Sequence, residues 1–175
     1  MWNDALFAYL HFAAIFGLVW FIAQEWLLLR AGAGSLDLER LARVDGLFGM
    51  FAGLVLLTGA VRAVWGAKGW SFYAHNPVFH AKIGLFVLVG LLSIAPTIAF
   101  LRWRKTRRAD PAWRVTEPDW RRARRFVLVE LHLLALIPLA AVLAERERFA
   151  GRRVGVILSG GNVDLDALPW LSTPA

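Results

Sequence analysis

The segment "ALFAYLHFAAIFGLVWFIAQEWLLL", residues Ala5–Leu29, is almost continuously apolar. A helix needs about 20 such residues to cross the roughly 30 Å hydrocarbon core of a bilayer. Three further segments of comparable length and character follow it, at about Asp45–Val64, Val78–Leu101 and Phe126–Ala144. The sequence therefore predicts an all-α fold, a four-helix transmembrane bundle with a short non-helical C-terminal tail.

The composition supports this interpretation. Hydrophobic residues make up 58% of the 175-residue chain and charged residues 19%, with 9 Trp and 12 Phe, which is too apolar for an ordinary soluble domain of this size. The chain has no Cys, which excludes disulfides, iron–sulfur clusters and thiolate-ligated or covalently attached haem. The first apolar segment lacks a basic start and a small-residue cleavage site, so we expect it to stay as a span.

Basic residues indicate how the chain is oriented. Ten of the 20 Lys and Arg fall in the segment Arg102–Arg125, between two apolar segments. The positive-inside rule places this segment in the cytoplasm and both termini outside a bacterial inner membrane. We expect the net charge of +7 to serve topology and contacts with anionic membrane lipids, and we expect no nucleic-acid partner.

Ionisable residues inside the spans are the candidate functional groups, because each needs a partner or a polar cavity there. His11 and Glu25 lie fourteen residues apart, within about 40° of each other around a helix, so both are expected to face the bundle. Gly49 and Gly53 form a G-x-x-x-G pattern that predicts close approach of a neighbouring helix.

For two pairs of ionisable residues, the sequence does not decide which member faces the interior of the bundle. His80 and Lys82 are two residues apart, as are Glu130 and His132, and this spacing turns a helix by roughly 200°. Only one member of each pair can therefore face a given neighbour.

Two histidines on facing helices can hold a b-type haem. His11 and His80 are predicted at the same depth, near the outer side, and are the candidate iron ligands. Lys82 would lie near a haem propionate or act as an interfacial anchor. The alternative is that these histidines only make hydrogen bonds in helix packing.

Several segments carry a family resemblance: "ALFAYLHF", "AQEWLLLR", "HNPVFHAKIGLF" and "VLVELHLLALIPLAAVLAER". Over about residues 1–148 the chain resembles a bacterial inner-membrane family of four-helix proteins named as a domain of unknown function. It is more distantly similar to the haem-binding protoporphyrinogen oxidases and the copper-resistance D-like membrane proteins. The similarity to the oxidases implies His11 as a haem ligand and Lys82 as a functional group.

The tail "VGVILSGGNVDLDALPW", residues Val154–Trp170, differs in character from the rest of the chain. Its Ser-Gly-Gly-Asn turn resembles the C-terminal end of the pyridoxal-phosphate-dependent threonine/serine dehydratases, where Ser159 would approach the cofactor. No Schiff-base lysine motif or phosphate loop accompanies it. We therefore divide the chain into a membrane domain, 1–148, and a dehydratase-like remnant, 149–175, and expect neither pyridoxal phosphate nor dehydratase activity.

Two functions of different classes follow from these observations. The first is a haem-binding membrane redox protein. The second is a non-catalytic scaffold or lipid-binding bundle, in which Arg43, Asp45, Glu25 and Glu130 would form internal ion pairs. No hydrolase or Walker motif identifies catalytic residues, which stay unknown, and a homo-oligomer is kept as an alternative to a monomer.

The predicted topology can be tested with reporter fusions. A reporter at residue 112 should be active only as a cytoplasmic reporter, and one at residue 175 only as an exported reporter, because the basic segment resists translocation. A cytoplasmic reporter active at residue 175 would contradict either the orientation or the number of four spans.

Overall fold

The computed structural model describes residues 2–66 and 69–144, and this part of the chain is all-α, with no strand. The prediction of an all-α fold is confirmed. The predicted remnant, 149–175, lies outside the described residues. The elements are α1 (Trp2–Arg30), the short 3-10 helix η1 (Ala33–Ser35), α2 (Leu38–Trp65), α3 (Gly69–Ala74), α4 (Pro77–Ala109) and α5 (Glu117–Ala144).

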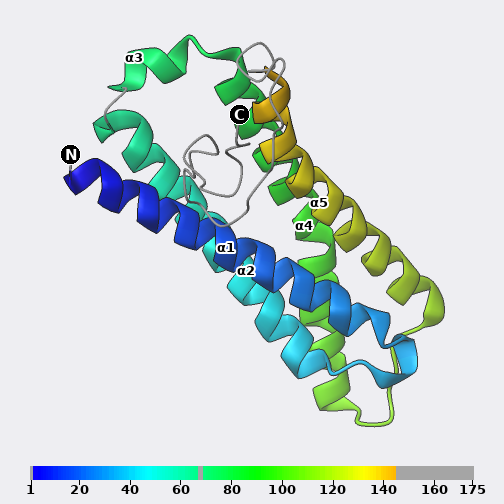
Figure 1. The fold of residues 1–175 in the computed structure, drawn as a ribbon. Coiled ribbons are helices and arrows are strands. Elements are labelled where there is room, and N and C mark those ends of the chain that lie inside the picture. The colour runs from blue at the N-terminus through cyan, green and yellow to red at the C-terminus, as the bar shows by residue number, and fades with distance from the viewer. Residues whose placement is uncertain (1, 67–68, 145–175) are drawn as a thin grey trace, which may run out of the picture. The chain divides into compact units, whose positions relative to one another are not determined.

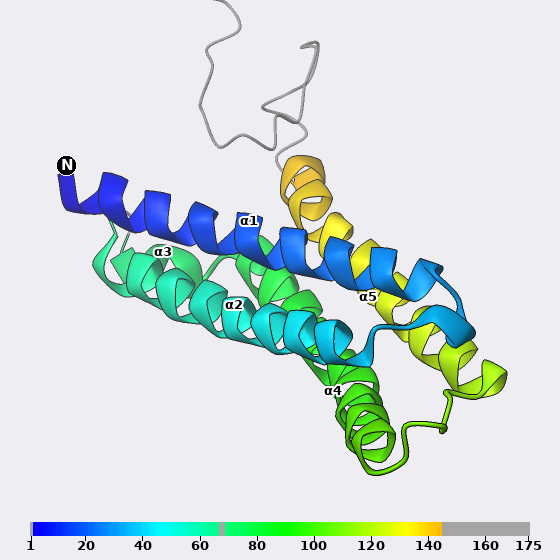
Figure 2. The same cartoon turned by 90° about the horizontal axis from the view of Figure 1, so that it is seen from below.

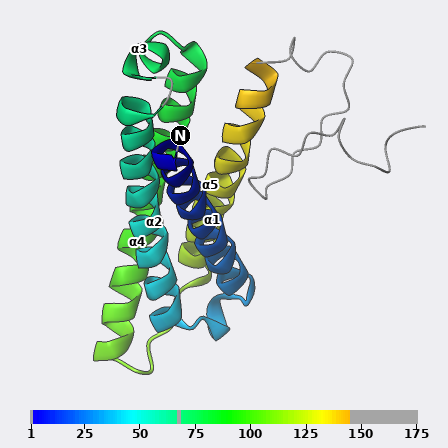
Figure 3. The same ribbon diagram turned by 60° about the vertical axis from the view of Figure 1, so that its left-hand side comes forward.

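The long helices form two antiparallel hairpins, as Figure 1 shows. α1 packs along α2, and α4 packs along α5, while α2 contacts α4 and α1 contacts α5. Figures 2 and 3 show that the α1–α2 and α4–α5 turns lie at one end of this arrangement, and that α3 lies at the other, near the start of α1. We call the end with the two turns the inner end.

The helices are longer than the predicted spans. Asp4–Arg30, Leu38–Trp65 and Pro77–Ala109 are long and apolar enough to cross a membrane, and the fourth predicted segment lies within α5. The basic segment Arg102–Arg125 consists mostly of helix ends, because α4 continues to Ala109 and α5 begins at Glu117. Arg and Lys are good helix formers, so the two helices extend beyond the apolar segments.

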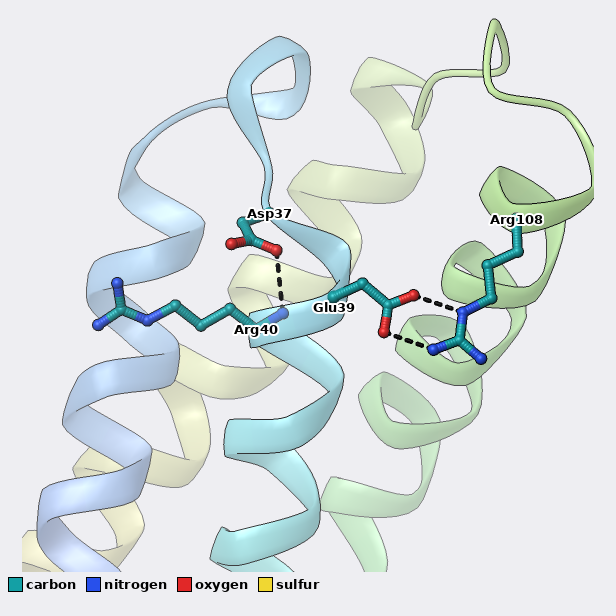
Figure 4. A network of polar contacts seen from close by, with 4 residues as sticks. All are labelled: Asp37, Glu39, Arg40 and Arg108. Carbon is teal, nitrogen blue, oxygen red and sulfur yellow. Dashed lines mark hydrogen bonds and ion pairs between the residues drawn. The ribbon is translucent and has the colours of Figure 1, made fainter.

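At the inner end, polar side chains cap the start of α2 and link α2 to α4. The Asp37 carboxylate accepts a hydrogen bond from the Arg40 backbone N–H at 3.0 Å and caps α2, as Figure 4 shows. In the same view, Glu39 of α2 accepts two hydrogen bonds from Arg108 of α4, at 2.5 and 2.7 Å. This bidentate pair joins the two hairpins, although both side chains are exposed, so its contribution to stability is small.

The buried core follows the helical period. On α1 the buried residues are Ala14, Leu18, Ile22, Glu25 and Leu29, spaced by three or four residues as one helix face requires. Phe48 of α2, Phe100 and Trp103 of α4 and Val127 of α5 belong to the same core. Many large apolar side chains on the other faces are exposed, including Trp20, Leu57 and Ile98, as expected where lipid is the surrounding solvent.

The close approach of α1 and α2 occurs at other glycines than those predicted. A Cβ atom added to Gly49 or Gly53 would meet nothing within 4 Å, so these residues allow no close helix contact among the described residues. A Cβ on Gly17 of α1 would instead lie 2.1 Å from Cε1 of Phe51. Within the described residues the contact predicted from the G-x-x-x-G pattern does not form, because that face of α2 points away from its neighbours.

This difference can be tested with one matched pair of variants. Gly17→Ala and Gly53→Ala gain the same helix propensity, up to about 1 kcal/mol, but only Gly17→Ala must displace the Phe51 ring. Gly17→Ala should therefore be less stable than Gly53→Ala by about 1–3 kcal/mol, measured by unfolding of the detergent-solubilised protein. Equal stability of the two variants would show that α1 and α2 do not meet at Gly17.

Candidate functional site

His11 lies on α1 and faces α2. Its Nδ1 atom is 2.9 Å from the Thr58 hydroxyl oxygen, and the Thr58 hydroxyl is 2.6 Å from the carbonyl oxygen of Leu54, to which it donates. Because the hydroxyl has one proton, Nδ1–H of His11 donates to Thr58. In the tautomer that makes this hydrogen bond, the lone pair is on Nε2.

Residues around His11 are tightly packed on one side and charged on the other. A Cβ on Gly59 would lie 3.2 Å from Cε1 of His11, so glycine is what lets the ring rest on α2. The guanidinium of Arg62 lies over the Phe12 ring at 5.5 Å and interacts electrostatically with His11. An imidazole and a guanidinium thus occur together near the outer end.

The other predicted ligand, His80, lies on α4 and is exposed. Its Nε2–H donates to the carbonyl oxygen of Ala74 at 2.8 Å. Lys82 on the same helix is half-buried. Among the described residues no hydrogen bond or ring contact joins His11 to His80, so their pairing on one haem stays a prediction.

Three carboxyl groups from three helices are buried in the core of the inner half. Glu25 of α1 and Glu130 of α5 are each 1% exposed, and Asp45 of α2 is 4% exposed. Glu25 interacts electrostatically with Asp45 and Glu130, and Glu130 with Asp45. We refer to these three residues as the carboxyl cluster.

The structure also settles which member of one ambiguous pair faces inward. Glu130 is buried, whereas His132 is exposed and donates from Nδ1 to the carbonyl oxygen of Leu128 at 2.7 Å. The predicted location of His11 and Glu25 on one side of α1 holds in part, because Glu25 is buried and His11 is half-buried.

The expected ion pairs with Arg43 do not form. Oδ1 of Asp45 accepts a hydrogen bond from the Thr97 hydroxyl of α4 at 2.8 Å, and within the described residues no salt bridge engages any member of the carboxyl cluster. Arg43 instead contributes to the positive surroundings of Glu39. Arg43 and Asp45 are two residues apart, and this spacing turns a helix by roughly 200°. The two side chains therefore face different neighbours of α2.

A half-buried arginine, Arg124, lies near the inner end of α5. The guanidinium of Arg124 stacks on the rings of Trp26 at 4.9 Å and Trp120 at 5.3 Å. Trp120 also donates from its indole N–H to the carbonyl oxygen of Leu29 at 2.9 Å. These contacts join α5 to the end of α1 and hold the Arg124 charge by cation–π interaction.

The start of α5 carries a basic surface pocket. Pro118, Arg121, Arg122 and Arg125 line an open pocket of about 390 Å³. Three guanidinium groups around one concavity are suited to an anionic oxygen group such as a phosphate. We refer to it as the arginine pocket.

Metal binding by several protein side chains has no support in this part of the chain. Within residues 2–66 and 69–144, no group of three or more His, Asp or Glu side chains is arranged to hold a metal ion. A haem iron needs only one or two axial ligands, so this finding leaves the haem prediction untested.

Two functional partners were missed from the sequence. Thr58 is hydrogen-bonded to His11, which lies 47 residues away in the sequence. Thr97 is hydrogen-bonded to Asp45, which lies 52 residues away. Each could have been found from the sequence as a lone hydroxyl residue inside an apolar span. A side-chain hydroxyl there needs an acceptor and can form a hydrogen bond to another helix.

The long apolar helices, the lipid-exposed apolar faces and the few polar contacts between helices define a helical integral membrane protein. More narrowly, the chain belongs to the family described as "Predicted membrane protein (DUF2214)", which matches residues 3–146. This confirms the resemblance drawn from the sequence to a membrane-protein family of unknown function over most of the chain.

One curated relative matches a short piece of the chain. It is the beta-hydroxyaspartate dehydratase of Paracoccus denitrificans (strain Pd 1222), 68% identical over 34 residues. The match covers 19% of this chain and only 11% of the dehydratase, and it agrees with the predicted dehydratase-like remnant. No solved structure matches the chain.

Proposed function

We propose that the protein is a b-type haem-binding redox protein of the membrane, with His11 as an axial ligand. The observation that supports this proposal is the hydrogen bond from His11 Nδ1–H to Thr58. Haem-ligating histidines use one nitrogen on the iron, while the other donates to a fixed partner that orients the ring. When bound, the haem would supply one-electron transfer.

The surroundings of His11 also carry positive charge that suits the propionate groups of a haem. Arg62, held over Phe12, is a partner for a haem propionate on the same side of the molecule. His80 would serve as the second ligand through Nδ1, since Nε2–H donates to Ala74. Lys82 is the second proposed propionate partner, consistent with the resemblance to the oxidases.

The visible spectrum of the purified chain tests this function. Protein expressed with adequate haem should show a Soret band that His11→Ala abolishes. Thr58→Val, which removes the partner of the ring, should weaken haem affinity by about 10–100-fold. His75→Ala is the matched control, because this exposed histidine donates only to the carbonyl oxygen of Ser71, and its Soret band should equal that of the wild type.

A wild-type protein without a Soret band would rule out the haem proposal. The same holds for a band that is unchanged in His11→Ala. A band lost in His11→Ala but unchanged in His80→Ala would keep haem binding and assign His11 as the sole histidine ligand.

A second candidate function is binding of anionic lipid as a non-catalytic scaffold. The arginine pocket supports it, because three Arg residues line one cavity at the inner end. A basic residue near an anionic membrane surface contributes about 1 kcal/mol of binding free energy. Phosphatidylglycerol is therefore the partner that this pocket would favour over a zwitterionic lipid.

This candidate can be tested in vesicles of stated composition. The variant Arg121→Gln/Arg122→Gln/Arg125→Gln should retain less phosphatidylglycerol, by about fivefold for each Arg if each contributes about 1 kcal/mol. Arg40→Gln is the control, since this inner-end arginine lies outside the pocket. Equal retention by the two variants, or equal retention of phosphatidylcholine and phosphatidylglycerol by the wild type, would contradict the proposal.

We further propose that the protein resides in a bacterial inner membrane and crosses it four times, with the segment 102–125 in the cytoplasm and both termini outside. The distribution of Lys and Arg supports this orientation. A homo-oligomer stays a proposal beside a monomer. Dehydratase activity is not expected, because the match to that enzyme covers so little of its length.

A further inference from the structure

The carboxyl cluster has no role in either proposed function, yet burying ionisable groups inside a membrane domain is costly. Its members come from separate helices, Glu25 from α1, Asp45 from α2 and Glu130 from α5, and all are at least 96% buried. Thr97 completes the surroundings from α4. All four long helices thus contribute a polar side chain to one place in the core.

Two of the carboxyl oxygens are left without partners. Oε2 of Glu25 and Oε1 of Glu130 are inaccessible to solvent and accept or donate no hydrogen bond among the described residues. Buried oxygens are nearly always hydrogen-bonded, and an unsatisfied one requires an explanation. Here each unsatisfied oxygen belongs to a residue that interacts electrostatically with the other carboxyl groups of the cluster.

Within residues 2–66 and 69–144, no ion pair joins a basic side chain to any of these groups. α1 and α5 contribute the two glutamates, α2 contributes Asp45, and α4 contributes the uncharged Thr97. The half-buried guanidinium of Arg124 on α5 stacks on Trp26 and Trp120. His132 faces away from Glu130.

Three negative charges in one low-dielectric place would repel each other strongly, and each would also lose its hydration. A proton on a carboxyl group removes the charge and supplies a donor. A neighbouring carboxyl oxygen can then accept the hydrogen bond, as in carboxyl pairs that share a proton.

We propose that Glu25, Asp45 and Glu130 form a proton-binding site inside the membrane domain, in which these buried carboxyl groups hold bound protons. Binding converts a carboxylate and a proton into a carboxylic acid, and no other bond changes. The unsatisfied oxygens of Glu25 and Glu130 are the positions where a bound proton would remove the buried charge. The site holds protons and not a metal ion, because the described side chains provide no metal-binding arrangement.

Infrared spectroscopy of the full chain in detergent tests the proposal directly. A protonated carboxylic acid has a carbonyl stretch distinct from the carboxylate bands, and it shifts when water is exchanged for heavy water. The wild type should show this band at neutral pH, where solvent-exposed carboxyl groups are ionised, and should lose it on alkaline titration.

Variants assign the band to the cluster. Glu25→Gln and Glu130→Gln keep the shape of the protonated side chain, so both should fold and both should lose band area. Glu39→Gln is the control, because Glu39 is exposed and bonded to Arg108, and its band should match the wild type. Should a glutamine variant fail to fold, Glu25→Asp keeps an acid at this position and should shift the band.

The proposal is overturned by any of three results. The first is that the wild type shows no protonated-acid band at neutral pH. The second is that the band is unchanged in the Glu25 and Glu130 variants. The third is that added sodium or potassium removes the band at constant pH. The last result would identify a monovalent-cation site in place of a proton site. None of these outcomes depends on whether the protein binds haem.

Discussion

A chain in hydrocarbon has no water with which to pair its backbone, so each N–H and C=O group must find a partner within the protein. In this protein the long helices α1, α2 and α4 satisfy that constraint over lengths sufficient to cross a bilayer. Because lipid is as apolar as a leucine side chain, burial alone does not drive the helices together. Close packing, as at Gly17 and Phe51, and a few polar contacts must do so.

The same constraint applies to polar side chains. His11 donates to Thr58 and Asp45 accepts from Thr97, in each case across two helices. Glu25 and Glu130 each keep one unsatisfied oxygen within the described residues. Groups that are costly to bury and are incompletely paired are the strongest indication of function in a membrane domain.

The two proposed chemistries occupy different levels of the same helix. His11 and Glu25 are fourteen residues apart on α1, which corresponds to about 21 Å along the helix axis. An electron-transfer group near the outer end and a proton-binding group in the inner half would therefore be distinct sites. Each can be removed by substitution without touching the other, and the proposed experiments treat them independently.

The sequence by itself determined the all-α fold, the positions of the long helices and the burial of Glu25, because apolar length and helical period depend only on the order of residues. It also identified His11 and one member of the pair Glu130 and His132 as groups needing a partner, without deciding which member of that pair faces inward. Only the tertiary structure decided what those partners are: Thr58, Thr97 and the other carboxyl groups. It also replaced the predicted glycine contact at Gly49 and Gly53 with one at Gly17. The physical reason is that a helix pattern fixes which residues share a face, while the rotation and contact of helices distant in sequence determine what that face meets.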